Sequence, residues 1–205
     1  MSLSVITRRS CRAVLPLSAI AALLVGCAAR TPPVTKYVPP ASGQTAKLVM
    51  RGTVPAGDNF GIFVYGDSEH CAGARSIGTG TSTRNPTTTA LAANQITTVE
   101  FYLLKPTREH CSIRYSFTPL AGKTYLLSGS AVEKGCVARM MDASDPDNIK
   151  PEAAVLRRNP GNSVCLPLSQ SRAVSVSEHD ASHKSGDAVL RQGVGAEDLQ
   201  GLIGQ

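Results

Sequence analysis

The chain has 205 residues, of which 21 are basic and 15 acidic, and its formal net charge is +6. Three of the basic residues and none of the acidic ones fall in the first 26 positions, so the remaining 179 residues carry a formal charge of only +3. The aromatic residues include no tryptophan, and no basic run follows except Arg157-Arg158. Nucleic-acid binding needs a clustered basic face with stacking aromatic rings, so the composition excludes nucleic acid as an expected partner.

The first 26 residues have the pattern of an export signal. Arg8, Arg9 and Arg12 lie in a polar n-region, and an apolar run of thirteen residues follows from position 13 to 25. Such a run is too short to cross a hydrocarbon core, which needs about 20 residues. A basic n-region before a short apolar segment is typical of a signal peptide, so we expect residues 1–26 to be removed.

The apolar run ends in Leu24-Val25-Gly26-Cys27, which resembles the lipobox of bacterial lipoproteins. The resemblance implies cleavage before Cys27 and acylation of that cysteine, palmitate included. Two membrane signals anchor a protein stably where one does so marginally, so a fully acylated Cys27 implies lasting membrane attachment. Ala28 resembles the residue found at this position in lipoproteins sorted to the outer membrane, so we expect a cell-envelope location there, on the periplasmic face or at the cell surface. An ordinary secreted protein is the alternative.

Residues 27–45 are expected to form a Pro-rich tether. They include Pro32-Pro33 and Pro39-Pro40, and Pro-rich segments are extended, semi-rigid spacers. The tether would hold the following domain away from the lipid surface.

Period-two alternation predicts an all-β domain over residues 46–168. Short alternating strands separated by turn signals indicate an antiparallel β-sandwich or barrel. A Thr-, Gly- and Asn-rich stretch at 77–94 interrupts the pattern and is interpreted as a long loop. The inward faces are predicted to be Leu48 and Met50; Phe60, Ile62 and Val64; Val99, Phe101 and Leu103; Cys111, Ile113, Tyr115 and Phe117; Tyr125 and Leu127; Cys136, Ala138 and Met140.

One short helix is expected from Pro151 to Arg158, because proline is well placed in a first helical turn and Asn159-Pro160-Gly161 would end it. Residues 169–205 are Ser-, Gly- and Asp-rich, so we expect a flexible, disordered polar tail.

Four cysteines remain once Cys11 is removed with the signal and Cys27 is acylated: Cys71, Cys111, Cys136 and Cys165. In an oxidising compartment an even count indicates two disulfides, and four cysteines allow three pairings. We favour the sequential pairing, Cys71–Cys111 with Cys136–Cys165.

The tripeptide Glu-His-Cys occurs twice, at 69–71 and at 109–111. Two thiolates and two imidazoles would suit zinc, which makes His70 and His110 weak candidate metal ligands. Oxidation would instead bond the sulfurs, and adjacent side chains in a strand point to opposite faces. We therefore favour the disulfide interpretation and predict no metal and no cofactor.

The run Phe117-Thr118-Pro119, the segment from Gly122 to Tyr125, Cys136 and the late Cys165 resemble a group of poorly characterised proteobacterial lipoproteins. Those proteins carry a small β-sandwich of the transthyretin-like kind behind the lipobox. The resemblance covers residues 46–168 and implies fold and location, but no activity.

No Gly-x-Ser-x-Gly elbow occurs, and Ser128-Gly129-Ser130 lies inside an expected strand. We therefore predict no catalytic residue and a chain that is not an enzyme. The expected function is a non-catalytic interaction or scaffolding module that contacts an envelope protein by its loops or a sheet edge. The alternative is a module that binds a small molecule, glycan or metal, with the 77–94 loop and the two tripeptides as its expected site.

Overall fold

The computed structural model describes residues 34–160, 164–174, 188–189 and 191–192. The expected signal peptide, Cys27 and most of the expected tail lie outside these residues. No helix in the described part of the chain is long and apolar enough to span a bilayer.

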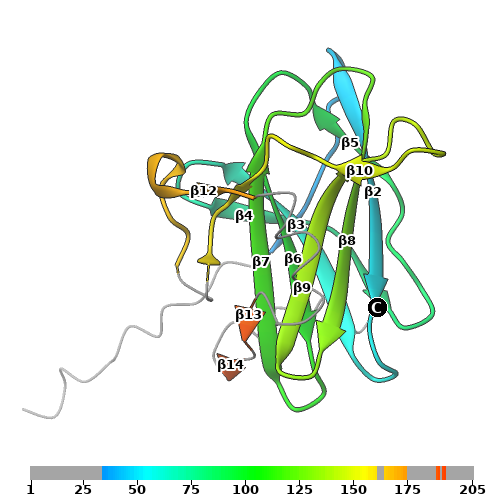
Figure 1. Ribbon diagram of the computed structural model, residues 1–205, viewed down its shortest axis with the longest axis vertical. Coiled ribbons are helices and arrows are strands. Elements are labelled where there is room, and N and C mark those ends of the chain that lie inside the picture. Colours follow the sequence, from blue (N-terminus) through cyan, green and yellow to red (C-terminus); the bar gives the residue numbers. More distant parts are fainter. Residues whose placement is uncertain (1–33, 161–163, 175–187, 190, 193–205) are drawn as a thin grey trace, which may run out of the picture. The chain divides into compact units, whose positions relative to one another are not determined.

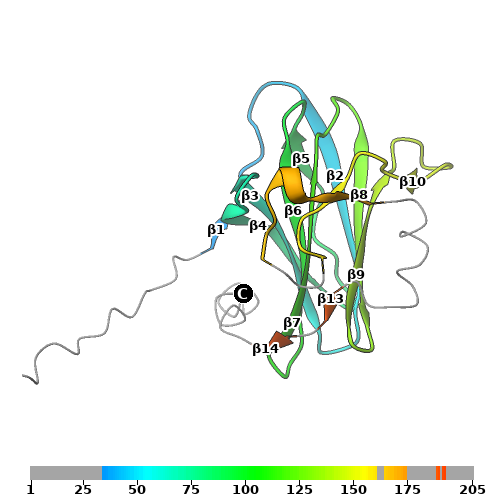
Figure 2. The same cartoon turned by 60° about the vertical axis from the view of Figure 1, so that its left-hand side comes forward.

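The described residues form two β-sheets that pack face to face as a sandwich (Figures 1 and 2). Sheet A runs in the order β1 (Thr35–Lys36), β4 (Ala72–Thr81), β3 (Asn59–Asp67), β6 (Thr97–Leu104), β7 (Glu109–Phe117), β11 (Leu156–Arg157) and β12 (Arg172–Ala173), with β14 (Arg191–Gln192) also paired to β7. Sheet B runs in the order β10 (Lys150–Pro151), β9 (Gly135–Asp142), β8 (Thr124–Val132), β2 (Thr45–Thr53) and β5 (Thr89–Ala92), with β13 (Ala188–Val189) also paired to β9. The predicted all-β sandwich is confirmed.

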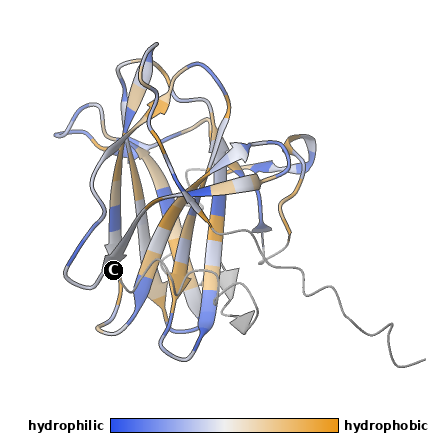
Figure 3. Cartoon of the chain, turned by 180° about the vertical axis from the view of Figure 1, so that it is seen from behind, coloured by the Kyte–Doolittle hydropathy of each residue, from blue (hydrophilic) through white to orange (hydrophobic). Residues whose placement is uncertain are grey.

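The core contains the side chains that alternation predicts, and Figure 3 shows apolar and polar residues alternating along the strands. All seventeen predicted inward side chains are at most 5 % exposed. Successive strand residues point to opposite faces. Once one residue of a strand is correctly assigned to the buried face, the orientation of every other side chain in that strand follows.

Large rings from sheet A fill the space opposite glycines of sheet B. Phe60 and Phe101 stack with centroids 5.6 Å apart. A Cβ at Gly52 would lie 2.3 Å from the Phe60 ring, and one at Gly129 would lie 2.3 Å from the Phe101 ring. Gly129 is therefore explained by core packing.

A disulfide and a hydrogen bond connect the two sheets through the core. Cys111 on β7 is bonded to Cys136 on β9, and the Tyr115 hydroxyl on β7 donates to the carbonyl of Ala138 on β9, 2.6 Å away. The predicted partner of Cys111 was Cys71, so the sequential pairing is wrong. These two cysteines are bonded because they lie on the inward faces of opposing sheets, and their order in the sequence does not decide the pairing.

Two strand pairs are parallel, unlike the antiparallel pairing that alternation suggested. β2 pairs with β8 in parallel over seven residues, from Lys47 opposite Thr124 to Thr53 opposite Ser130, and the short β1 pairs in parallel with β4. Alternation determines which face of a strand is buried but not the direction of the strand relative to its neighbours. The parallel pairs therefore could not be predicted from it.

The expected helix from Pro151 to Arg158 is not formed: Pro151 ends β10 and Leu156–Arg157 form β11. β11 pairs with β7, where Leu156 lies opposite Ser116. Val155 is fully buried in the core and Arg158 is fully buried in a polar site, so tertiary contacts override a proline that suits a helix start. A short 3-10 turn, η3 (Leu168–Gln170), occurs farther along the chain.

The sandwich also includes segments that were expected outside it. β1 lies within the expected tether, and β12, β13 and β14 lie within the expected tail. The expected 77–94 loop is shorter than predicted, because β4 continues to Thr81 and β5 begins at Thr89.

Candidate functional site

A hollow of about 250 Å³ opens between the edges of the two sheets, and we call it the edge hollow. Its lining comes from β3 and β4 of sheet A, from β5 of sheet B and from the connection between β5 and β6. Its lining consists of Tyr37, Val38, Pro40, Val64, Tyr65, Gly66, Ser68, Arg75, Leu91, Ala92, Gln95, Ile96 and Thr97.

The segment that follows β1 forms a fixed wall of the edge hollow. The backbone N–H of Tyr37 donates to the carbonyl of Ser76 in sheet A at 2.7 Å. The Tyr37 hydroxyl donates to the carbonyl of Ala90 in sheet B at 3.0 Å. Burial raises the pKa of this phenol, and nearby Arg75 partly offsets the rise. Tyr37 therefore spans the open edge of the sandwich and presents the next residue, Val38, at the rim.

Two large apolar side chains of the lining, Val38 and Ile96, are exposed to solvent, and we call them the rim of the edge hollow. Val38 is 77 % exposed and Ile96 is 41 % exposed. Both belong to the small set of large apolar side chains that stand out into solvent in the described part of the chain. Single exposed apolar residues are ordinary on protein surfaces, whereas apolar groups gathered at a concave site indicate contact with another molecule. Two such residues on one hollow therefore make it the best candidate site.

Arg75 is the only charged residue in the lining of the edge hollow. It lies on β4 opposite Val64 of β3. A Cβ at Gly66 would lie 3.4 Å from a terminal nitrogen of its guanidinium, so the glycine leaves room for the arginine. No ion pair of Arg75 occurs among the described residues, and the carboxylate of Asp67 is paired with His70 Nδ1, 2.8 Å away.

Tyr65, a lining residue of the edge hollow, also belongs to a buried polar cluster on the outer face of sheet A. The Tyr65 hydroxyl donates to one carboxylate oxygen of Glu100, and Arg114 Nε donates to the other at 3.0 Å. The Arg114 guanidinium also lies 5.7 Å from the centroid of the Tyr65 ring. Burial and the negative charge of Glu100 raise the pKa of Tyr65 far above its usual value. The phenol therefore stays protonated and acts as a fixed donor.

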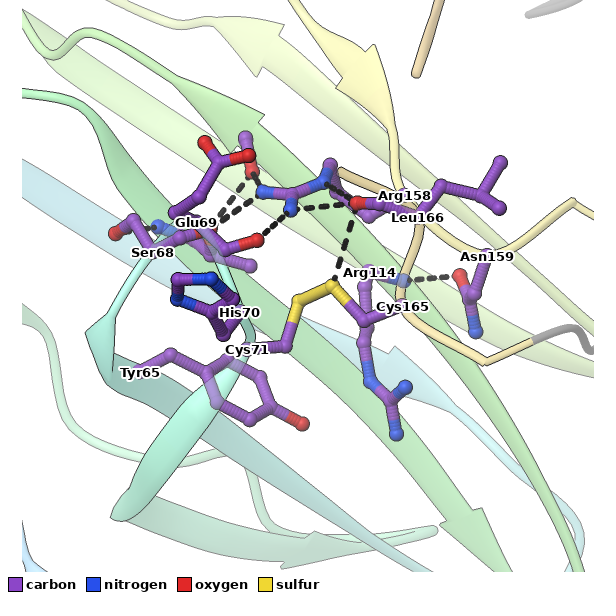
Figure 4. The surroundings of a disulfide bond; sticks show 12 residues. Tyr65, Ser68, Glu69, His70, Cys71, Arg114, Arg158, Asn159, Cys165 and Leu166 are labelled. Carbon is purple, nitrogen blue, oxygen red and sulfur yellow. Dashed lines mark hydrogen bonds between the residues drawn. A yellow bond between two sulfur atoms is a disulfide. The ribbon is translucent and has the colours of Figure 1, made fainter. Parts of the chain in front are cut away.

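The turn between β3 and β4, residues 68–71, is fastened to the segment 158–168 by an arrangement that we call the clasp (Figure 4). Arg158 is its centre. Its guanidinium donates to the carbonyls of Ser68, Glu69 and Leu166, and to the hydroxyls of Thr98 and Ser116, at 2.5–3.3 Å.

The clasp contains two further links. Cys71 is bonded to Cys165, so the predicted pair Cys136–Cys165 is also wrong. The carboxylate of Glu69 accepts from the backbone N–H of Leu168 at 3.1 Å. Three different interactions thus hold the same turn against one segment.

Ser68 joins the clasp to the edge hollow. Its carbonyl accepts from Arg158, while its hydroxyl donates to the carbonyl of Ile96 at 3.1 Å and accepts from the Thr98 N–H at 3.1 Å. The rim residue Ile96 is therefore positioned through the clasp.

The two Glu-His-Cys tripeptides are in different surroundings, and their cysteines belong to different disulfides. His70 lies in the exposed turn and contacts Asp67. His110 lies on β7, where its ring stacks on Tyr102 with centroids 5.4 Å apart. No group of three or more potential metal ligands occurs in the described residues.

Sequence reasoning did not find the edge hollow or the buried Arg158. Val38 lies in a segment interpreted as tether, and Arg158 lies at the end of the supposed helix. The available signal was Tyr37, a large aromatic residue within a Pro-rich stretch.

Comparisons with protein families, with curated proteins and with solved structures find no match for this chain.

Proposed function

We propose that the chain is an envelope lipoprotein, anchored to the outer membrane through Cys27, whose sandwich is a non-catalytic protein-interaction module. We further propose that the partner, another envelope protein, docks at the edge hollow. The observation that carries this proposal is the pair of exposed apolar side chains, Val38 and Ile96, on the rim of one pre-formed hollow.

The size of the edge hollow favours a protein over a small molecule. Sites that enclose a drug-sized ligand measure about 300–1,000 Å³, and the edge hollow measures about 250 Å³. Its rim is also open, since Val38 is 77 % exposed. A hollow of this kind suits one or two side chains of a partner that continues across the surrounding surface.

Site-specific photo-crosslinking in intact cells tests the docking site. A photoreactive amino acid would replace Val38 or Ile96, and Leu120 would be the control position because its exposure, 47 %, is close to that of Ile96. We expect positions 38 and 96 to give an adduct with the same envelope protein and position 120 to give none. Adducts of equal yield at all three positions, or none at any, would contradict the proposal.

The anchor is tested separately. We expect labelled palmitate to be incorporated into the wild-type chain and not into Cys27→Ala, which should leave the membrane fraction. A Cys27→Ala chain that stays membrane-bound would show that another segment anchors it.

A further inference from the structure

The lining of the edge hollow offers a partner one charged hydrogen-bond donor, Arg75. The hydroxyl of Tyr37 donates to Ala90, that of Ser68 donates to Ile96, and that of Thr97 donates to the carbonyl of Gln95. These three hydroxyls are therefore committed to backbone carbonyls.

Arg75 is not committed in this way. Its guanidinium has no ion pair within the described residues, and the lining of the edge hollow contains no aspartate or glutamate. Arginine presents donors in a planar fork that matches a carboxylate in two parallel hydrogen bonds. The charge of the site is therefore complementary to an anion, and its shape offers apolar surface beside that anion.

We propose that the edge hollow recognises an acidic segment of the partner protein, in which one carboxylate pairs with Arg75 and a neighbouring apolar side chain packs between Val38 and Ile96. This inference rests on the proposed function and specifies the chemistry of the partner. A structural role for Arg75 is the competing explanation, because charges near the edge of a sheet prevent sheets from joining edge to edge, and only the two-residue β1 separates Arg75 from that edge. The two explanations make different demands on the charge at position 75. A charge of either sign would prevent sheets from joining, whereas recognition of an acidic segment needs a positive charge.

A random heptapeptide library displayed on phage provides the probe. Peptides would be selected on the full-length protein in detergent, and their affinities would then be measured for wild type, Arg75→Glu and Arg84→Glu. Arg84 is an exposed arginine outside the edge hollow and provides the matched control.

We expect the selected peptides to carry aspartate or glutamate beside a large apolar residue. Affinity should fall at least about tenfold in Arg75→Glu and change less than about twofold in Arg84→Glu, because truncating or reversing one partner of a specific charge pair weakens binding while remote charges are screened. Replacing the acidic peptide residue by lysine should weaken binding to wild type and restore binding to Arg75→Glu.

Three outcomes would overturn the inference. They are a selected set without acidic residues, equal binding to Arg75→Glu and wild type, and the recovery of no peptide that depends on Arg75. Competition by a synthetic peptide of residues 193–205, which contains Glu197-Asp198-Leu199, would also overturn it by making the chain's own end the occupant.

Crosslinking separates this inference from the proposed function. If positions 38 and 96 yield the same adduct in wild type and in Arg75→Glu, the docking site stands and the acidic partner is wrong. If neither position yields an adduct in wild type, the proposed function itself fails.

Discussion

Arg158 has no exposed surface, yet every hydrogen bond described for its guanidinium goes to an uncharged oxygen. Burial lowers the pKa of this guanidinium, and the charges of Glu69 and Asp67 partly offset the effect. An arginine is effectively always charged in proteins, so here a buried cation is stabilised by carbonyl dipoles. The carbonyl of Glu69 depends on it most, because the hydroxyls of Thr98 and Ser171 also donate to the carbonyls of Ser68 and Leu166.

Arg158→Met should destabilise the fold by at least about 3 kcal/mol, because each buried acceptor left without a donor costs roughly 1–3 kcal/mol. Arg158→Lys should recover only part of the loss, because one ammonium cannot reach carbonyls on both sides of the clasp. Urea unfolding followed by circular dichroism measures both changes. Arg84→Met, an exposed control, should stay within about 0.5 kcal/mol of wild type, and a similarly small effect at Arg158 would show that the clasp contributes little.

Asp142 gives a pH-dependent prediction. Its carboxylate accepts from Lys123 Nζ at 2.8 Å and from the Ser144 N–H at 3.0 Å. These bonds, with that from Lys123 the largest cause, hold the pKa of Asp142 well below its usual value. A depressed pKa in the folded state stabilises the protein at every pH above the unfolded value, about 3.9, and this stabilisation is lost as the pH falls below it.

Asp142→Asn should therefore lower the free energy of unfolding by roughly 1–3 kcal/mol at pH 7. The difference from wild type should remain constant down to about pH 5 and shrink below about pH 4. Urea unfolding between pH 2 and pH 8 would show this, with Glu133→Gln, an exposed carboxylate in the β8–β9 turn, as the control. A difference that grows on acidification would contradict the assignment.

At the scale of elements, the two disulfides differ in accessibility. Cys111 and Cys136 are 1 % and 0 % exposed in the core, whereas Cys71 and Cys165 are half-buried at the surface. Thiol–disulfide exchange requires a thiolate to reach a sulfur atom. The clasp disulfide is therefore the accessible one.

We expect Cys71 and Cys165 to be reduced first when dithiothreitol is titrated into the native protein. Alkylation of free thiols and peptide mass spectrometry would identify them, and Cys111 and Cys136 should react only once the sandwich unfolds. Simultaneous alkylation of all four cysteines below the unfolding transition would contradict the prediction. Cys71 and Cys165 are 94 residues apart, so on the chain-entropy scale breaking their disulfide lowers the free energy of unfolding by at most about 4.7 kcal/mol.

The elements also show what the sequence could and could not predict. Period-two alternation identified the long strands other than β4, with their buried faces, because one register determines every side chain of a strand. It also placed Cys111 and Cys136 on the inward faces of their strands, and this shared position could have predicted their disulfide. Pairing the cysteines in sequence order gave the wrong partners. The partner of Cys71 could not be predicted, because the clasp depends on the path of residues 158–168 after the supposed helix. The edge hollow depends on two sheet edges meeting, which no local pattern encodes.

At the scale of the whole molecule, the distance between Cys27 and the sandwich is short. β1 begins at Thr35, so eight residue steps separate the proposed anchor from the first strand and span at most about 27 Å. Val38, on the rim of the edge hollow, follows three residues later. An anchor at Cys27 would therefore confine the proposed docking site near the membrane, which would favour a partner held at the same membrane.

Inserting a 20-residue Gly/Ser segment between Thr31 and Pro32 tests this confinement. Effective concentration falls roughly as the −3/2 power of tether length, so lengthening eight steps to 28 should lower the crosslinking yield at position 38 by about sixfold. The disulfides and unfolding free energy should not change, because the insertion precedes every described strand. Residue composition can be separated from length by replacing residues 28–31 with Gly/Ser, which should leave the yield near that of wild type. An unchanged yield in the lengthened chain would mean that the partner is free to diffuse to the edge hollow, and the short tether would then serve only to retain the protein.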